Sequence, residues 1–246
     1  NATITCGNFK THIFTGPGTF CVSSAGNAAG TSTVDYFVVA GGGGTNTGGG
    51  GAGGFRVSNT VGCVAACLMS PLANPTGLPV SVQGYPVVVG AGGASNHPAD
   101  STPGSVSSFS SISSAGGGFG QSNDQTDSGG SGGSGGGGGR SSTTNPGGGA
   151  GNTPPVNPPQ GNNGASTGAS ASYNAGSGGG AGGAATPSNG ATTSVAGIGS
   201  FVADTFIGPT APSYGEPGPV SSTRYFAGGG GGGMGSGCNA GGIGGG

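Results

Sequence analysis

The sequence predicts an all-β fold in which short N-terminal strands, or a small sandwich of them, are followed by a packed bundle of polyglycine II helices, with no α-helix. Glycine supplies 67 of the 246 residues. Apolar runs of strand length lie mainly in the first third of the chain, and no twelve-residue stretch has helical periodicity. Because glycine loses the most backbone entropy on folding, such a chain either stays disordered or adopts a geometry that glycine permits.

Short strands are expected at the start of the chain. Residues 10–14 and 19–22 are joined by Gly16-Pro17-Gly18, a strong turn signal, and are predicted to form a hairpin. Residues 34–40 are apolar and rich in β-branched and aromatic side chains, which predicts the most buried strand.

A second β pair is predicted from residues 80–82 and 85–90, where Pro86 lies near a strand start. Val106, Phe109 and Ile112 recur three residues apart, a spacing that suits one face of a helix. The surrounding serines and glycines favour a strand or an extended threefold helix instead.

From residue 115 onward, glycine blocks alternate with polar or proline-rich spacers. The blocks are residues 116–118, 129–139, 147–151, 176–183, 228–237 and 241–246, and the spacers are residues 152–163, 186–193 and 209–225. Blocks joined by turns are typical of a back-and-forth bundle of extended helices that bond laterally through their backbones. At about 3.1 Å per residue, block 129–139 would span roughly 34 Å. The alternative is a flexible low-complexity linker.

This change in composition suggests two regions. Residues 1–114 form a β-rich region that includes the first glycine block, and residues 115–246 form the glycine-helix bundle with its proline-rich loops. Both could belong to one continuous domain, because a glycine block, residues 41–54, already lies within the first region.

The five cysteines cannot all pair within one chain. Cys6 and Cys21 flank the predicted hairpin and are the candidate disulfide. Cys238 is left for an intermolecular contact or a free thiol. Alternatively, all five are small buried apolar side chains. Cys63 and Cys67 lie close together but lack a second pair of ligands, so no metal site is expected there.

Charged residues are few, with four basic and six acidic side chains and a net charge of -2. This gives no basic surface for nucleic acid, and no apolar run is long enough to span a membrane. The only lysine, Lys10, lies outside any phosphate-binding glycine loop. We therefore expect no enzymatic activity and no cofactor. Asp35, Arg56 and Arg224 flank glycine blocks and either pin the block ends or are exposed.

Other titratable residues give weak signals. His12 is expected on the outer face of a strand. His97 and Asp100 could form a catalytic or metal-binding pair, but Pro98 and the glycine-rich flanks favour a solvated turn. Asp124 and Asp127 could offer oxygen ligands to Ca²⁺, although no bidentate glutamate accompanies them.

The order of the islands between the glycines resembles the glycine-rich domain of tailed-phage tail fibre and virion surface proteins, especially those of cyanophages and other marine phages. These islands are VDYFVVAGGGG (34–44), GGGGAGGFR (48–56), YPVVVGAGG (85–93), SSFSSISSAGGGFG (107–120), GGAGNTPPVNPPQGNNG (148–164) and IGPTAPSYGEPGPVSSTRYFAGGGGGG (207–233). The resemblance extends from about residue 10 to residue 246. Cys63, Cys67 and Cys238 are not part of the pattern.

This resemblance implies a structural protein at the virion surface, a tail fibre or appendage module that attaches to the host. The expected partners are copies of itself, most simply in a trimer, other virion proteins, and a host-surface glycan or protein. Tyr214, Tyr225 and Phe226 are the candidate receptor contacts, because aromatic rings pack on sugar faces. Two alternatives are a capsid decoration or head fibre scaffold without a ligand, and a subunit of a self-assembling extracellular filament.

Overall fold

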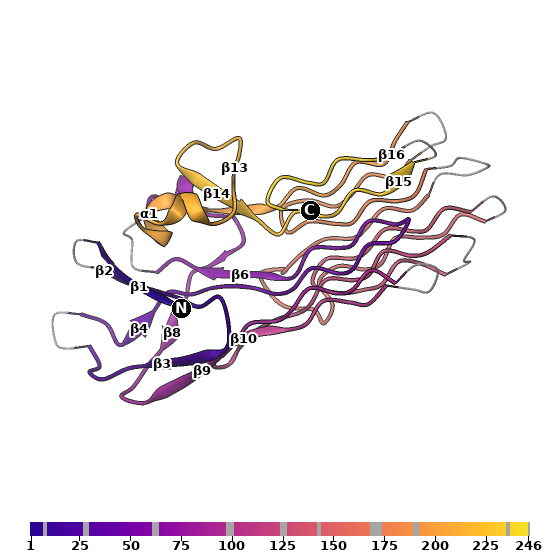
Figure 1. The fold of residues 1–246 in the computed structure, drawn as a ribbon. Helices are drawn as coiled ribbons and strands as arrows, with labels where there is room; N and C mark the ends of the chain where they lie inside the picture. The colour runs from indigo at the N-terminus through magenta and orange to yellow at the C-terminus, as the bar shows by residue number, and fades with distance from the viewer. Residues whose placement is uncertain are drawn as a thin grey trace.

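The computed structural model describes residues 1–6, 9–26, 30–60, 64–96, 101–123, 127–141, 144–167, 174–188, 192–234 and 237–245. Most of the small β-sheets gather at one end of an elongated molecule, and extended glycine-rich segments run side by side toward the other end (Figure 1). We call these segments the glycine array. In the described part of the chain, helix is limited to α1 (Asp204–Ile207) and the 3₁₀ turns η1 (Ala66–Leu68) and η2 (Ala211–Ser213). The all-β prediction is confirmed at this level, but the expectation that there is no α-helix is wrong, because Asp204–Ile207 form one helical turn.

The predicted N-terminal hairpin is wrong in its pairing, although both strands form. β2 (Phe9–Ile13) pairs antiparallel with β1 (Ala2–Cys6). β3 (Gly18–Cys21) pairs instead with β9 (Gly84–Val88), which places Phe20 opposite Tyr85. The pairing with β9 gathers aromatic rings, because the Phe20 ring centroid lies 5.6 Å from that of Phe109. A local turn signal indicates that the chain reverses but does not say which strand edges meet.

The second predicted pair is also wrong, since residues 80–82 do not pair with β9. The Val80 N–H instead donates to the Ser32 carbonyl at 2.8 Å, beside the pairing of β4 (Thr33–Val34) with β8 (Leu78–Pro79). The strand interpretation of residues 106–112 is confirmed. There β10 (Ser107–Phe109) and β11 (Ile112–Ser114) form a hairpin, and the sheet has the order β11-β10-β9-β3.

The apolar run at residues 34–40 forms two strands, β4 and β5 (Phe37–Val39), rather than one. The extended strand is interrupted at Asp35. Its carboxylate accepts hydrogen bonds from the Ser58 hydroxyl (2.7 Å) and the Thr60 amide (3.0 Å). The expectation that this run is the most buried strand is wrong. Phe55 and Val57 of β6 (Phe55–Ser58) are each 1% exposed, against 8% for Val38.

The remaining sheets are small. They comprise β5 and β6 with β7 (Ala73–Asn74), β12 (Ser200–Ala203) and β14 (Thr223–Phe226) with β13 (Glu216–Pro217), and β15 (Gly233–Met234) with β16 (Gly237–Cys238). The main hydrophobic cluster contains Phe55 and Val57 together with Val202 and Ile207. Phe37 stacks edge-on against Phe55 and Phe226 across this cluster. The core at the sheet end therefore joins residues from before and after position 115.

The glycine array is held by backbone hydrogen bonds between segments that are far apart in the sequence. Residues 134–138 bond to six other parts of the chain. Residues three apart bond to the same neighbouring segments. Positions 134 and 137 bond to segments 48–54 and 115–122, and positions 135 and 138 bond to segments 160–167 and 174–180. Position 136 bonds to residues 130 and 149. A strand in a sheet has two neighbours and a period of two, so this pattern is not that of a sheet.

Glycine is required where these segments approach most closely. A Cβ atom on Gly137 would overlap the carbonyl oxygen of Gly176, and one on Gly135 would overlap that of Gly149. All residues from 132 to 139 are buried. Backbone atoms therefore fill the space that side chains occupy in an ordinary core.

The straight 34 Å span predicted for residues 129–139 is wrong. The chain bends at residues 132–134, and the Gly136 N–H donates to the Gly130 carbonyl at 2.9 Å. Residues 176–183 likewise bend at residues 181–183. A run of glycines has no side chains to oppose bending, so its length in sequence does not give the length of a straight segment.

Candidate functional site

The loop at residues 152–159 lies where the sheets meet the glycine array. Its following residue, Gln160, is buried and bridges three parts of the chain. Its Oε1 accepts from the Ala115 N–H (2.8 Å), its Nε2 donates to the Pro154 carbonyl (2.8 Å), and its own carbonyl accepts from the Phe55 N–H (2.9 Å). Gln160 thus fixes the loop to strand β6 and to the start of segment 115–122.

Asn152 organises the same loop from its other end. Its side-chain Oδ1 accepts from the N–H groups of Val156 (3.1 Å) and Gln160 (3.2 Å), and its Nδ2 donates to the Val156 carbonyl (3.2 Å). The exposed tip comprises Thr153, Pro154 and Pro155. The loop therefore presents a proline-rich surface that is already ordered by its own hydrogen bonds.

The second proline-rich segment, residues 209–225, is held by Arg224. The guanidinium donates to two successive carbonyls, from Nε to Tyr214 (2.8 Å) and from Nη2 to Gly215 (2.7 Å). Arg224 and Asp35 thus form hydrogen bonds with neighbouring backbone groups. This agrees with the first of the two interpretations from the sequence, in which these side chains hold the ends of the glycine blocks in place. Arg56 makes a longer contact, 3.5 Å from Nη1 to the Ser113 carbonyl.

The three candidate receptor-contact rings do not share one face. Tyr225 is 5% exposed and packs against Phe201, with 5.2 Å between ring centroids. Phe226, the next residue of β14, packs against Phe37 at 4.8 Å. Tyr214 is half-buried against the main hydrophobic cluster. These side chains stabilise the sheet end, and their contact with a receptor stays a prediction.

The described cysteines are exposed. Cys21, Cys67 and Cys238 carry free thiols at the surface, so the alternative of five buried cysteines is wrong for these three. The side chain of Cys6 and all of Cys63 lie outside the described residues. The pairing of Cys6 with Cys21 therefore stays a prediction, while Cys21 itself is unbonded in this structure.

The titratable groups form no catalytic or metal centre in the part of the chain that the structure describes. No group of three His, Cys, Asp or Glu side chains in those ranges could hold a metal ion. His12 lies with its Nδ1 3.1 Å from the Thr3 hydroxyl. Partial burial, and then repulsion from Lys10, lower the pKa of His12 below its ordinary value. His97, Asp100 and Asp124 lie outside the described residues.

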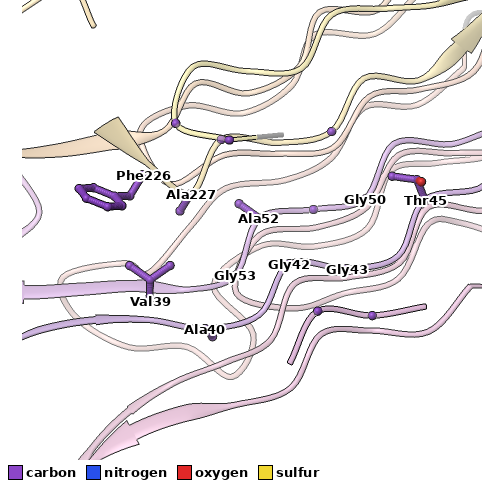
Figure 2. Close-up of a pocket in the computed structure, with 17 residues that line it drawn as sticks. Val39, Ala40, Gly42, Gly43, Thr45, Gly50, Ala52, Gly53, Phe226 and Ala227 are labelled. Atoms are coloured by element: carbon purple, nitrogen blue, oxygen red, sulfur yellow. The ribbon is translucent and has the colours of Figure 1, made fainter. Parts of the chain in front are cut away.

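Two grooves are present at the surface. One, of about 490 Å³, lies beside η1 and is lined by Cys67, Met69 and Phe201 among others. The other, of about 410 Å³, lies within the glycine array and is lined mainly by glycine and alanine. Figure 2 shows Val39 and Phe226 toward one end of this second groove and Thr45 toward the other. We call it the array groove.

No pattern in the sequence indicates the array groove. Its lining residues come from within segments 39–45, 50–53, 92–93 and 226–230, together with Gly244 and Gly245. In the sequence these glycines look like those of the buried segments. Only the neighbours of each glycine in the folded chain distinguish the two sets.

The chain matches the profile of the glycine-rich domain over residues 15–246. It therefore belongs to the glycine-rich domain family. Comparison with curated proteins and with solved structures gives no significant match. In the described residues, no helix has the length and apolar character needed to cross a membrane.

Proposed function

We propose that the protein is a structural module of a tailed-phage virion appendage, such as a tail fibre, and attaches the particle to the host surface. The observation that carries this proposal is the six-neighbour bonding of residues 134–138. A rod bonded in all lateral directions resists bending and shear without a large side-chain core. Such stiffness suits a part that projects from a particle and bears load.

We propose further that the segments of the array are polyglycine II helices. A threefold extended helix directs one N–H and one C=O per residue around its axis, which gives six lateral bonding directions. The three-residue repeat of partners along residues 134–138 supports this conformation. A crystal structure in which these residues have φ near −75° and ψ near +145° would agree with it, and dihedral angles of antiparallel strands would contradict it.

Attachment is assigned to the two proline-rich loops. Asn152, Gln160 and Arg224 order them before any ligand binds, which lowers the entropy cost of binding. Their exposed residues include Thr153 and Pro155. The partner is a glycan or a protein on the host surface, with Tyr214 and Phe226 as the half-buried rings nearest the second loop.

The copies of the chain are proposed to associate, most simply as a trimer. Val195 and Ile198 are exposed three residues apart on an outer segment of the array. Exposed Ile243 lies beside them, because the Gly199 N–H donates to the Ile243 carbonyl at 2.8 Å. An apolar stripe on an otherwise polar surface favours contact with another protein surface. Sedimentation of the wild type and of Ile198→Ser tests this; a monomer at all concentrations contradicts it.

Immunogold labelling of purified particles tests the position of the protein. Label at fibre tips supports the proposal, whereas label spread over capsids favours the ligand-free decoration scaffold. Label on free filaments alone contradicts a virion role.

For attachment, residues 153–155 and 217–219 are replaced by Gly and Ser, and Asn152, Gln160 and Arg224 are kept. The control replaces exposed residues 23–25. Cell binding should fall only for the loop variant, and unchanged binding would contradict assignment of attachment to these loops.

A second candidate function is the self-assembling extracellular filament. The observation that favours it is the edge of β1, which in the described chain pairs only with β2. Such an edge can add to the sheet of a neighbouring copy, and the exposed thiol of Cys238 could then link the copies. Electron microscopy of the purified chain, with Cys238→Ser as the comparison, tests this function. Absence of filaments in both samples contradicts it.

A further inference from the structure

The array groove is not used by the function proposed above. Segment 50–53 is buried at its base, while Gly42, Thr45 and Gly92 are exposed along one side. Between the apolar end at Phe226 and the hydroxyl end at Thr45, the lining consists of glycine and alanine (Figure 2). The groove is therefore a channel with backbone walls.

Seven residues that line this groove outside the strands have N–H groups with no acceptor among the described residues. They are Gly42, Thr45, Gly50, Gly53, Gly92, Ala227 and Gly245. Four of them form two pairs on the long walls, Gly42 with Thr45 and Gly50 with Gly53, and the members of each pair are three residues apart. This is the same spacing at which residues 134–138 bond to their neighbours inside the array. The groove thus offers the donors of an internal array position without the segment that would accept from them.

We infer that the array groove binds an extended glycine-rich segment of another polypeptide chain. Donors three residues apart along such a wall lie about 9 Å apart, at about 3.1 Å per residue. A threefold extended chain repeats its carbonyls at this distance, whereas a β-strand has a period of two residues. The bound segment must be nearly free of side chains, because inside the array a Cβ on a glycine such as Gly137 overlaps a neighbouring backbone.

Residues 244 and 245 form part of the wall of the groove and do not occupy it. The Gly244 N–H donates to the Glu216 carboxylate at 2.9 Å. This bond holds Gly244 at β13. The segment that binds comes from another chain, so the groove acts as a joint between modules. This joint does not depend on the host-attachment role.

The test uses a blocked peptide with the sequence of residues 48–54, Gly-Gly-Gly-Gly-Ala-Gly-Gly. It is titrated into the isotopically labelled full chain, and amide chemical shifts and hydrogen exchange are recorded. Binding should shift and protect the N–H groups of Gly42, Thr45, Gly50 and Gly53. A peptide of equal length that alternates Gly with Val should not bind. Absence of shifts at millimolar peptide, or shifts confined to other residues, overturns the inference.

A substitution that fills the groove provides the matching variant. A Cβ on Gly42 would have as its nearest neighbour the Gly51 carbonyl oxygen at 3.7 Å, so a side chain can begin at this position without displacing backbone. Gly42→Leu should weaken peptide binding by at least about tenfold, with an unchanged unfolding midpoint. The control is Gly16→Leu, because no atom lies within 4 Å of a Cβ at Gly16. Equal affinity for both variants places the peptide elsewhere and overturns the inference.

Discussion

The close packing of the glycine array predicts that one added methyl group inside it is strongly destabilising. Gly137 lies at the centre of residues 134–138. Its N–H donates to the Gly49 carbonyl (2.7 Å), and its carbonyl accepts from the Gln121 N–H (3.1 Å). In Gly137→Ala, the new Cβ would overlap the carbonyl oxygen of Gly176, so one of the two segments must move.

The magnitude follows from the hydrogen bonds that this movement breaks. Gly176 accepts from the Gly49 N–H (2.9 Å) and donates to the Gly138 carbonyl (2.9 Å). A buried backbone group left without a partner costs about 1–3 kcal/mol, so the loss of two bonds costs about 2–6 kcal/mol. Alanine stiffens the unfolded chain, which returns about 0.4–1 kcal/mol. The free energy of unfolding should therefore fall by about 1–6 kcal/mol, a large part of the stability of a domain.

Guanidinium unfolding followed by tyrosine fluorescence measures this change. The matched control is Gly92→Ala in the same array, where the nearest atom to a Cβ is the Gly42 carbonyl oxygen at 3.8 Å. The control should be neutral or stabilised by up to about 1 kcal/mol. If Gly137→Ala and Gly92→Ala unfold at the same denaturant concentration, close backbone packing does not hold the array together and the reasoning is refuted.

Three further predictions concern polar contacts. Gln160→Ala should lower the free energy of unfolding by about 1–3 kcal/mol, because it leaves the Ala115 N–H without its acceptor; denaturant unfolding measures it. NMR titration should give His12 a pKa below 6.5, and Lys10→Gln should raise it, because partial burial and Lys10 both disfavour the charged ring. Since the folded state favours neutral His12, its contribution to stability is present above pH 6.5 and is lost as pH falls through its folded pKa. Arg224→Lys should cost about 1–2 kcal/mol and speed amide exchange in β13 and β14, because an ammonium cannot donate in a fork to two carbonyls.

Each of these three has a result that contradicts it. For Gln160→Ala, the contradicting result is a change in the free energy of unfolding within about 0.5 kcal/mol of zero. A change of that size is expected for an exposed loop variant such as Asn157→Ala. For His12, it is a pKa of 6.5 or above in the folded chain. For Arg224→Lys, the contradicting result is amide hydrogen exchange in β13 and β14 at the wild-type rate, with no change elsewhere in the chain.

Strand positions could be predicted from short patterns, but strand pairing could not. The runs around Lys10, Phe20 and Tyr85 all form strands, because β-branched and aromatic side chains favour extended backbone wherever they pair. β3 nevertheless pairs with β9, not with β2. Its partner is set by which edge places Phe20 among Tyr85 and Phe109, a contact between distant parts of the chain.

The candidate site was predicted less well than the strands. The proline-rich loop after Asn152 could be located from its composition, but its ordering by Gln160 depends on strand β6, about 100 residues earlier in the sequence. Tyr225 and Phe226 are adjacent aromatic residues at the end of a spacer, and the sequence does not distinguish them. Because successive residues of a strand point to opposite faces, the structure separates these two rings and buries Tyr225.

By itself, the sequence determined that the protein is a β-structured chain in which backbone groups must replace side chains, because composition fixes how little apolar and charged surface there is to use. Only the tertiary structure decided where each glycine block bends, and which glycines are enclosed, like Gly137, or open, like Gly42. The physical reason is that glycine has no side chain. One glycine looks like another until its neighbours in space, set by hydrogen bonds to distant segments, give it a role.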